Sequence, residues 1–428
     1  MTQKQNSSVP AIIVCILLFG MISFVTNLAS PMGKVLESQF EVAEWMGKLG
    51  VFCNFIAYAI MGIPAGIILQ KKGYKFTALT AVGVGFIGVG IQTIAGLLEG
   101  NLAFGIYLLG AFVAGFSMCM LNIVVNPMLN KLAGGGNRGN QLVQVGGSFN
   151  SLMGTATIML TGLLLGDIAK AQISQIFPLM YTALAIFALA FVVILFTKIP
   201  ENPTVGAKVT EKSQYGPMSF RHFVLGAVAI FIYVGVEVGI PNLLNDWLID
   251  PNAVALSTGV AGMVTGTYWL LMLVGRLLGA AVGAKVSAKA MLATVSVVGL
   301  GLVAGAIFLN PAILVKMPVF DGANGFTMAE VPINAALLVL CGLCTSVMWG
   351  GIFNLAVEGL GKYTEKGAGI FMAMVCGGGI LPLLQGVVVT ATKGNYLASY
   401  WVIAAGLAFL LYYALVGCKN VNKDIPTE

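Results

Sequence analysis

Charged residues and histidine are scarce in this chain. Only 9% of its 428 residues are Asp, Glu, Lys or Arg, and there is a single histidine, whereas 58% are hydrophobic. Soluble domains carry about 25% charged residues, so this composition excludes a soluble protein. The net charge of +6 does not indicate a nucleic-acid partner, because the basic residues stand in short loops between long apolar runs. The sequence therefore predicts a protein of the lipid bilayer.

Several motifs of energy-coupled and catalytic proteins are also absent. The chain has no phosphate-binding G-x-x-x-x-G-K-[ST] loop, no H-E-x-x-H or G-x-S-x-G motif and no pair of catalytic carboxylates. We therefore expect neither an ATP-driven transporter nor a membrane enzyme, and no metal or cofactor. Nearly all of the seven cysteines fall in apolar runs, which favours free thiols that pack as small side chains.

Apolar stretches of about 20 residues, long enough for a helix to cross a membrane, recur along the chain. They fall into two sets of six, and a polar segment rich in proline, glycine and charge separates the sets. The predicted spans are 10–35, 45–70, 76–98, 103–130, 141–167, 175–197, 221–247, 257–282, 289–310, 332–356, 366–391 and 396–417.

This pattern predicts an all-α membrane protein with twelve transmembrane helices in two six-helix pseudo-symmetric bundles. The first bundle takes residues 1–197, the linker residues 198–219 and the second bundle residues 220–428. Two such halves describe the major facilitator fold, in which the binding site lies near the bilayer midplane between the halves.

Lysine and arginine are distributed unevenly between alternate loops. One set of loops, with Lys71, Lys131 and Lys362 among its members, holds roughly three times as many basic residues as the other set, which includes Lys34 and Lys316. The positive-inside rule assigns the basic loops to the cytoplasm, so we expect both chain termini there as well.

Polar amides interrupt the apolar runs of the first half. Asn122 and Asn126 are four residues apart and share one helix face, beside Pro127, which removes a backbone donor. Asn150 lies in the next span. An amide in hydrocarbon is costly unless it is paired or faces a wet cavity, so we predict that these residues form half of a polar site. The alternative is that they only hold neighbouring helices together.

Two ionisable residues lie clearly within predicted spans, Glu237 in the seventh and Arg276 in the eighth. A charge at membrane depth is a functional candidate. Pro241 cannot donate to the carbonyl of Glu237, so we expect a free oxygen beside a carboxylate in a helix that can unwind locally. That geometry suits a coupling cation or sugar hydroxyls. The alternative is a structural Glu237–Arg276 pair that joins two helices.

Aromatic and amide side chains complete the predicted site from the second half. An aromatic ring can stack on the C–H face of a sugar, while amides bind its hydroxyls. Trp269 and Trp349 lie deep enough in their spans for such a role. Asn242 follows Glu237 in the seventh span, and Asn354 and Gln385 lie in the tenth and eleventh.

Short motifs stand at characteristic places along these spans. The loop from Gly66 to Lys75 is similar to the superfamily signature G-x-x-x-D-R-x-G-R-K, with Gln70 in the aspartate position. Further stretches are Ile63-Pro64-Ala65-Gly66, Asn126-Pro127, Ser148-Phe149-Asn150-Ser151, Tyr233-Val234-Gly235-Val236-Glu237, Gly275-Arg276, Gly359-Leu360-Gly361-Lys362-Tyr363-Thr364 and Gly377-Gly378-Gly379. Together these stretches resemble the fucose–galactose–glucose:proton symporter (fucose permease) family over most of the chain.

Two acids of that family are absent from this sequence. Ser30, in Asn27-Leu28-Ala29-Ser30-Pro31, stands where the fucose permease has an aspartate, and Asn122 where it has a glutamate four residues before the N-P pair. Those acids are its proton-coupling candidates, whereas Ser30 and Asn122 do not titrate near neutral pH. The family's proton mechanism therefore does not carry over intact, and Glu237 becomes the coupling candidate.

The resemblance implies a secondary transporter that imports a monosaccharide or related sugar by alternating access, coupled to a proton or sodium. It also implies a monomer in a bacterial inner membrane. A sugar uniporter without ion coupling and an exporter of the same superfamily remain open. The predicted sugar-binding residues are Asn27, Ser30, Asn122, Asn126, Asn150, Asn242, Trp269, Trp349, Asn354 and Gln385.

Overall fold

The computed structural model describes residues 9–40, 49–98, 100–165, 175, 177–201, 215–321, 325–422 and 424–427. Five helices form the first half of this described chain: α2 (Val9–Phe40), α4 (Leu49–Ala95), α5 (Gly100–Leu132), α6 (Gly136–Leu165) and α7 (Phe177–Phe196). The backbone of α4 kinks at Gly73, where φ is 85°, a conformation that glycine adopts readily because it has no Cβ.

The second half contains helices and one β-hairpin. In chain order these are α8 (Arg221–Ile249), α9 (Thr258–Val282), α10 (Ala288–Phe308), β1 (Leu314–Asp321), β2 (Gly325–Pro332), α11 (Ile333–Thr345), α12 (Met348–Val357), α13 (Thr364–Ala373), α14 (Gly377–Ala391) and α15 (Tyr396–Tyr412). The tenth predicted span is thus divided into α11 and α12, and the eleventh into α13 and α14. A π-helical turn, Tyr413–Gly417, extends α15.

Ten helical segments of the described residues are long and apolar enough to cross a membrane. One of them, Phe52–Ala95, covers two predicted spans because α4 continues through the kink at Gly73. The fifth predicted span falls on α6, whose glycines and amides make it less apolar. Each of the twelve predicted spans therefore corresponds to a helix, part of one or a pair, and the predicted membrane fold is confirmed. Most of the predicted linker, residues 202–214, lies outside the described residues.

The segment after the ninth span is not helical. It forms an antiparallel hairpin of β1 and β2. Alternate side chains on one of its faces are buried, including Val319, Ala329 and Val331. The backbone N–H of Phe320 donates to the hydroxyl of Thr267 on α9 at 2.9 Å. The strands therefore form because one apolar face packs on the bundle while the other stays exposed.

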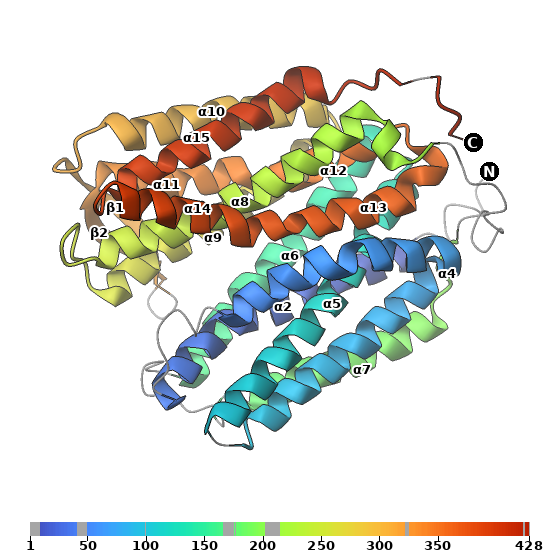
Figure 1. The fold of residues 1–428 in the computed structure, drawn as a ribbon, viewed down its shortest axis with the longest axis horizontal. Coiled ribbons are helices and arrows are strands. Elements are labelled where there is room, and N and C mark those ends of the chain that lie inside the picture. The colour runs from blue at the N-terminus through green and yellow to red at the C-terminus, as the bar shows by residue number, and fades with distance from the viewer. Residues whose placement is uncertain are drawn as a thin grey trace.

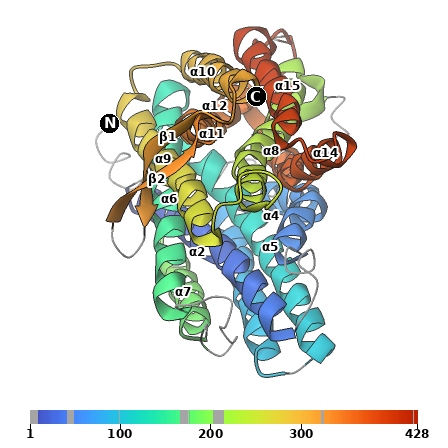
Figure 2. The same cartoon turned by 90° about the vertical axis from the view of Figure 1, so that its left-hand side faces the viewer.

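The two ends of the bundle differ in charge. The basic end is defined here by the loops that carry Lys71, Lys131, Lys285 and Lys362, and the hairpin end by β1 and β2. Figure 1 shows the two halves lying together near the basic end, at the right, and diverging towards the hairpin end, at the left. Figure 2 looks onto the hairpin end, with the second half above the first. Across the halves, α4 packs against α13 and α6 against α9.

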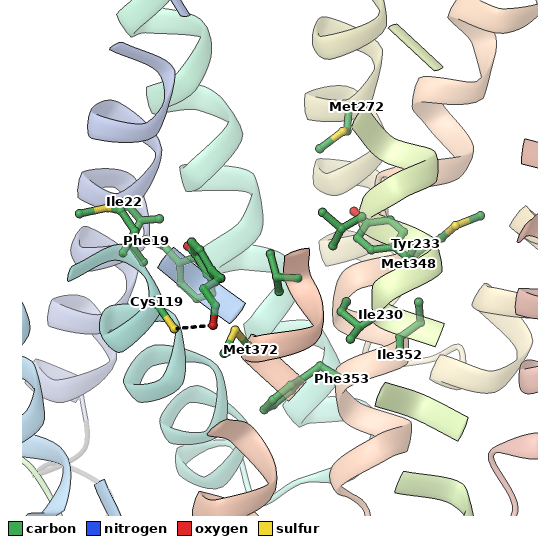
Figure 3. Close-up of a cluster of buried hydrophobic side chains, with 14 of the residues drawn as sticks. Phe19, Ile22, Cys119, Ile230, Tyr233, Met272, Met348, Ile352, Phe353 and Met372 are labelled. Atoms are coloured by element: carbon green, nitrogen blue, oxygen red, sulfur yellow. Dashed lines mark hydrogen bonds between the residues drawn. The ribbon is translucent and has the colours of Figure 1, made fainter. Parts of the chain in front are cut away.

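Buried apolar side chains from both halves pack inside the bundle. Phe19, Ile22 and Cys119 come from the first half, and Met348 and Met372 are among those of the second (Figure 3). All seven cysteines lie within the described residues and are free thiols, as predicted.

Candidate functional site

A cavity of about 240 Å³ lies between the two halves. Helices α2, α4, α5 and α6 supply one wall, and α8, α9 and the segment around the α11–α12 break supply most of the other. Its polar lining consists of Ser23, Thr26, Asn27, Tyr58, Asn122, Gln144, Asn150, Ser151, Thr155, Glu237, Trp269, Arg276, Ser346 and Trp349. Seven of the twelve predicted site residues are in this set, which brings together groups far apart in sequence.

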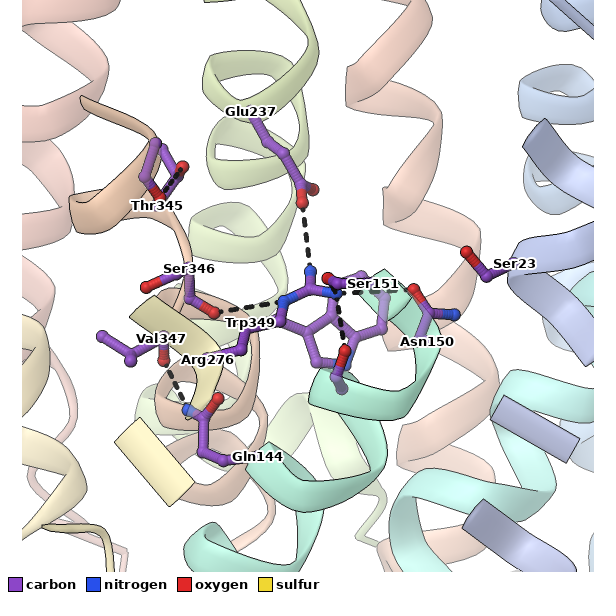
Figure 4. A network of polar contacts seen from close by, with 12 residues as sticks. Ser23, Gln144, Asn150, Ser151, Glu237, Arg276, Thr345, Ser346, Val347 and Trp349 are labelled. Atoms are coloured by element: carbon purple, nitrogen blue, oxygen red, sulfur yellow. Dashed lines mark hydrogen bonds and ion pairs between the residues drawn. The ribbon is translucent and has the colours of Figure 1, made fainter. Parts of the chain in front are cut away.

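Arg276 lies at the centre of the polar network (Figure 4). Its Nη1 donates to Ser151 Oγ at 2.7 Å and to the carbonyl of Gly147 at 3.0 Å, and it reaches Asn150 Oδ1 at 3.4 Å. Its Nε donates to the carbonyl of Ser346 at 3.4 Å. The sequence predicted Arg276 as a functional candidate or as a structural partner of Glu237, and the structure places it in the cavity, bonded to both halves.

Glu237 is the anion that faces this guanidinium. Its Oε1 lies 3.3 Å from Arg276 Nη2, and the two side chains are only 12% and 9% exposed. The pair that the sequence analysis raised as the structural alternative is therefore present. A carboxylate that accepts from a paired guanidinium is stabilised in a low-dielectric cavity, although removing one partner leaves the other charge uncompensated.

The backbone beside Glu237 differs from the expected cation site. The helix α8 runs unbroken from Arg221 to Ile249 through Pro241, so the expected local unwinding is absent. The carbonyl of Glu237 accepts from the hydroxyl of Tyr268 at 3.2 Å, so a tyrosine on the neighbouring helix satisfies the oxygen that Pro241 leaves without its helical donor. Asn242 is exposed and does not line the cavity.

The amides of the first half form a connected series on their wall of the cavity. Asn122 donates to the hydroxyl of Tyr58 at 2.8 Å, and Asn126 donates to the carbonyl of Asn122 at 2.9 Å. Asn150 donates to the carbonyl of Phe19 at 2.9 Å, and Asn27 donates to that of Ser23 at 2.8 Å. Asn27, Asn122 and Asn150 line the cavity, whereas Asn126 is fully buried just beyond it.

The two predicted tryptophans both line the cavity. Trp349 donates from Nε1 to Asn126 Oδ1 at 2.9 Å, so it links the halves beneath the cavity. Trp269 packs edge-on against Tyr268, with ring centroids 5.3 Å apart. Tryptophan rings facing a wall that carries amides are the chemistry that a ring with an apolar face and hydroxyls needs.

Three further predicted residues, besides Asn126 and Asn242, lie outside the cavity lining or cannot be placed. Asn354 accepts from Asn130 at 2.5 Å, nearer the basic end, and is absent from the cavity lining. Gln385 is fully buried beside Gly239, and its amide has no hydrogen-bond partner among the described residues. The side chain of Ser30 lies outside the described residues, although its backbone belongs to α2.

Several polar residues of the cavity were missed from the sequence. Gln144, Gly147 and Ser151 follow one another at helical spacing on α6, on the face that carries Asn150. Gln144 donates to the carbonyl of Val347 across the halves at 2.8 Å. The helical spacing was a usable signal for Gln144 and Ser151, but the contribution of Ser346 depends on a helix break that no local pattern indicated.

Two six-helix halves around a central polar cavity define a transporter fold of the major facilitator superfamily. No family model matches the chain. It is 28% identical to a glucose/galactose transporter of Brucella abortus, over 98% of this chain and 97% of that protein. It is 20% identical to the L-fucose-proton symporter of Escherichia coli, over 96% and 94% of the two chains.

Among solved structures, the fold is similar to that of FucP, a major facilitator transporter, in its outward conformation. The TM-score is 0.80 at 19% identity, covering 95% of this chain and 98% of that chain. The resemblance to the fucose–galactose–glucose:proton symporter family that the motifs indicated is thereby confirmed.

Proposed function

We propose that this protein imports a monosaccharide across the membrane as a secondary transporter, by alternating access of the central cavity. The observation that carries the proposal is the cavity between the halves, with amides on one wall and Trp269, Trp349 and the Glu237–Arg276 pair on the other. Its volume of about 240 Å³ lies just below the range of roughly 300–1,000 Å³ typical of sites for drug-sized ligands, which favours a smaller ligand such as a single sugar ring.

The relatives support the same substrate class, since their names specify glucose, galactose and L-fucose. The cavity supports it independently, because the one cation and the one anion among its described lining residues pair with each other. The polar groups left for a ligand are mainly amides and hydroxyls, which suit an uncharged polyol.

The direction of opening follows from where the halves touch. Hydrogen bonds that join the halves in the described part of the chain, from those of Asn150 to the Tyr74–Glu365 contact, lie at the level of Arg276 or nearer the basic end. With the basic end in the cytoplasm, this structure corresponds to an outward-open transporter in the bacterial inner membrane, with both termini inside. The monomer carries both halves of the site.

A sugar uniporter is the second candidate, and one observation favours it. Glu237 is already neutralised by Arg276, and the neighbouring carbonyl is taken by Tyr268. The neutral Ser30 and Asn122 add no titratable group. An exporter of amphipathic drugs is less well matched, because the cavity is small and rich in amides.

Uptake into proteoliposomes tests the substrate class directly. Labelled glucose, galactose, fucose, a disaccharide and an amphipathic dye are offered with and without an imposed proton or sodium gradient. We expect saturable uptake of at least one monosaccharide and accumulation above equilibrium under one gradient. Uptake without accumulation assigns a uniporter, and transport of the dye without any sugar contradicts the proposal.

Thiol labelling tests the orientation. A cysteine introduced at Gly206, in the central linker, is placed in a variant without native cysteines. We expect impermeant thiol reagents to label it only from the cytoplasmic side. Labelling of intact cells from outside contradicts the assigned topology.

A further inference from the structure

Arg276 lines the cavity and bonds to both halves through three side-chain nitrogens, Nε, Nη1 and Nη2. From α9, it reaches Gly147, Asn150 and Ser151 on α6, and also Glu237 on α8 and Ser346 beside the α11–α12 break. Its planar guanidinium can donate to all of these acceptors at the same time because it carries five N–H donors in a fixed fork. Figure 4 shows the side chain between the two walls.

The break between α11 and α12 supplies acceptors on the second half. The carbonyl of Ser346 accepts from Arg276, and that of Val347 accepts from Gln144 of the first half at 2.8 Å. A Cβ on Gly275 would clash with Ser346 Oγ, so the glycine of the Gly275-Arg276 pair is what lets the break approach α9. In this Gly-Arg pair, Gly275 leaves room for Ser346 and Arg276 donates a hydrogen bond to its carbonyl.

The partners of Arg276 lie in both halves, and its bonds to the first half can break without leaving its charge unpaired. Glu237 belongs to the same half as Arg276, so their ion pair persists when the halves move apart. The acceptors on α6 belong to the other half and separate from it. A buried guanidinium without any anion is costly, but here the charge stays compensated while the bonds to α6 break.

We propose that Arg276 is a positioning residue that straps α6 to the second half in the outward-open state, and that its release from Gly147, Asn150 and Ser151 permits opening at the basic end. A sugar hydroxyl that bonds to Asn150 or Ser151 competes with the guanidinium for the same acceptors and so favours release. The inference rests on the proposed function only in requiring that the halves separate at the basic end.

A disulfide across the basic end reports closure without any sugar. A Cβ on Gly283 would lie 3.4 Å from Cβ of Gln141, close to the spacing that a disulfide needs, about 3.5–4.5 Å. In a variant without native cysteines, Gln141→Cys with Gly283→Cys is oxidised in proteoliposomes and the cross-linking rate is measured. The strap variants are Arg276→Lys, which keeps the charge but loses the fork, and Ser151→Ala, which loses one bond.

Matched controls change the same residue types without crossing the halves. Arg221→Lys alters an arginine whose side chain donates to Tyr412 of its own half, and Ser148→Ala alters a hydroxyl bonded to Gln144 of its own helix. We expect Arg276→Lys to slow cross-linking by at least about fivefold and Ser151→Ala by about two- to tenfold, with both controls within about twofold of the parent.

Equal cross-linking rates in the strap variants and their controls contradict the proposal that Arg276 holds α6 to the second half. If Arg276→Lys does not insert, the comparison of Ser151→Ala with Ser148→Ala decides the matter alone. Sugar added to the parent is expected to slow cross-linking as well. Slower cross-linking in the variants with no response to any sugar retains the strap and contradicts the sugar-transport proposal, so the two failures are distinguishable.

Discussion

Two seams join the halves at the basic end, and they are built on different principles. In the glycine seam, between α4 and α13, backbones touch: a Cβ on Gly66 would lie 2.8 Å from Cα of Gly369, and one on Gly62 would lie 2.5 Å from the backbone nitrogen of Ala373. In the polar seam, α6 meets α9 and the α11–α12 break through hydrogen bonds from side chains such as Gln144 and Arg276.

The two seams differ in their relation to the cavity. Small residues four apart allow helices in a membrane to pack closely, with van der Waals contact as the attraction, and that contact does not involve the ligand. The polar seam instead shares Gln144, Asn150, Ser151 and Arg276 with the cavity lining. A ligand can therefore break hydrogen bonds of the polar seam directly. The glycine seam has no contact with the ligand and separates only when the halves move.

The largest effect is expected when the glycine seam is blocked. Gly66→Val puts a branched side chain against the backbone of Gly369, and backbone cannot move aside as a flexible side chain would. We expect the basic end to remain unsealed, with both sugar exchange and driven uptake lost. Uptake assays in proteoliposomes measure this, and the cross-linking rate between positions 141 and 283 should fall with it.

The control for this variant lies on the same helix. Gly90→Val adds the same side chain where no atom lies within 4 Å of the new Cβ, so transport should stay close to that of the parent. Transport in Gly66→Val equal to that in Gly90→Val contradicts the steric account of the glycine seam.

The anion that pairs with Arg276 of the polar seam is expected to give the next largest effect. Glu237→Gln removes the charge that compensates Arg276 while keeping the size of the side chain. If Glu237 couples the ion, the variant retains sugar counterflow but fails to accumulate sugar under an imposed proton or sodium gradient. Counterflow and gradient-driven uptake are measured on the same proteoliposomes.

Other outcomes of that experiment assign Glu237 differently. Accumulation equal to that of the parent makes Glu237 a structural partner of Arg276. No gradient-driven accumulation in the parent makes the protein a uniporter. The hydrogen bond from Tyr268 to the carbonyl of Glu237 argues against a sodium site at Glu237, because a cation would have to displace that hydroxyl.

The fold and the site could be predicted from the sequence to different degrees. Span number, the two sets of six and the basic loops follow from hydropathy and charge, which act locally along the chain. Asn150 and Glu237 were found because a polar group in an apolar run is conspicuous. The split of the tenth span at Ser346 was not predicted, since the close contact of Ser346 with α9 at Gly275 is a tertiary one that the local sequence does not show.

Predicted residues missed the cavity for a related reason. Asn242, Asn354 and Gln385 lie in the correct spans, but the face of a helix that meets the cavity depends on how the halves pack. The hairpin of β1 and β2 falls between two predicted spans and was not predicted, because its alternation of buried and exposed residues is short and interrupted by Pro318.

A moderate effect on affinity is expected from the amide that the polar seam shares with the cavity. Asn150→Ala removes an amide that lines the cavity and leaves the carbonyl of Phe19 without that donor. We expect sugar affinity to fall by about 1–3 kcal/mol, which corresponds to roughly five- to 150-fold in Kd. Equilibrium binding of the transported sugar to purified protein measures it.

Asn130 is the matched control, because it bonds across the halves to Asn354 but does not line the cavity. Asn130→Ala removes the donor to Asn354, so it should leave Kd within about twofold of the parent while loosening the basic end. Equal Kd in Asn150→Ala and the parent removes Asn150 from the site.

The smallest effect is expected from the polar contact of the glycine seam. The hydroxyl of Tyr74, which follows the kink of α4, donates to Glu365 Oε1 on α13 at 3.3 Å, a long hydrogen bond, and Glu365 has further interactions. Tyr74→Phe keeps the ring, which is 1% exposed, and removes only this bond. Because packing of glycines holds this seam, we expect cross-linking between positions 141 and 283 to change by less than about twofold, against about two- to tenfold for Ser151→Ala. A slowing as large as that of Ser151→Ala means that the Tyr74 hydroxyl holds the basic end closed as firmly as a bond of the polar seam, and that the division between a steric seam and a polar seam is wrong.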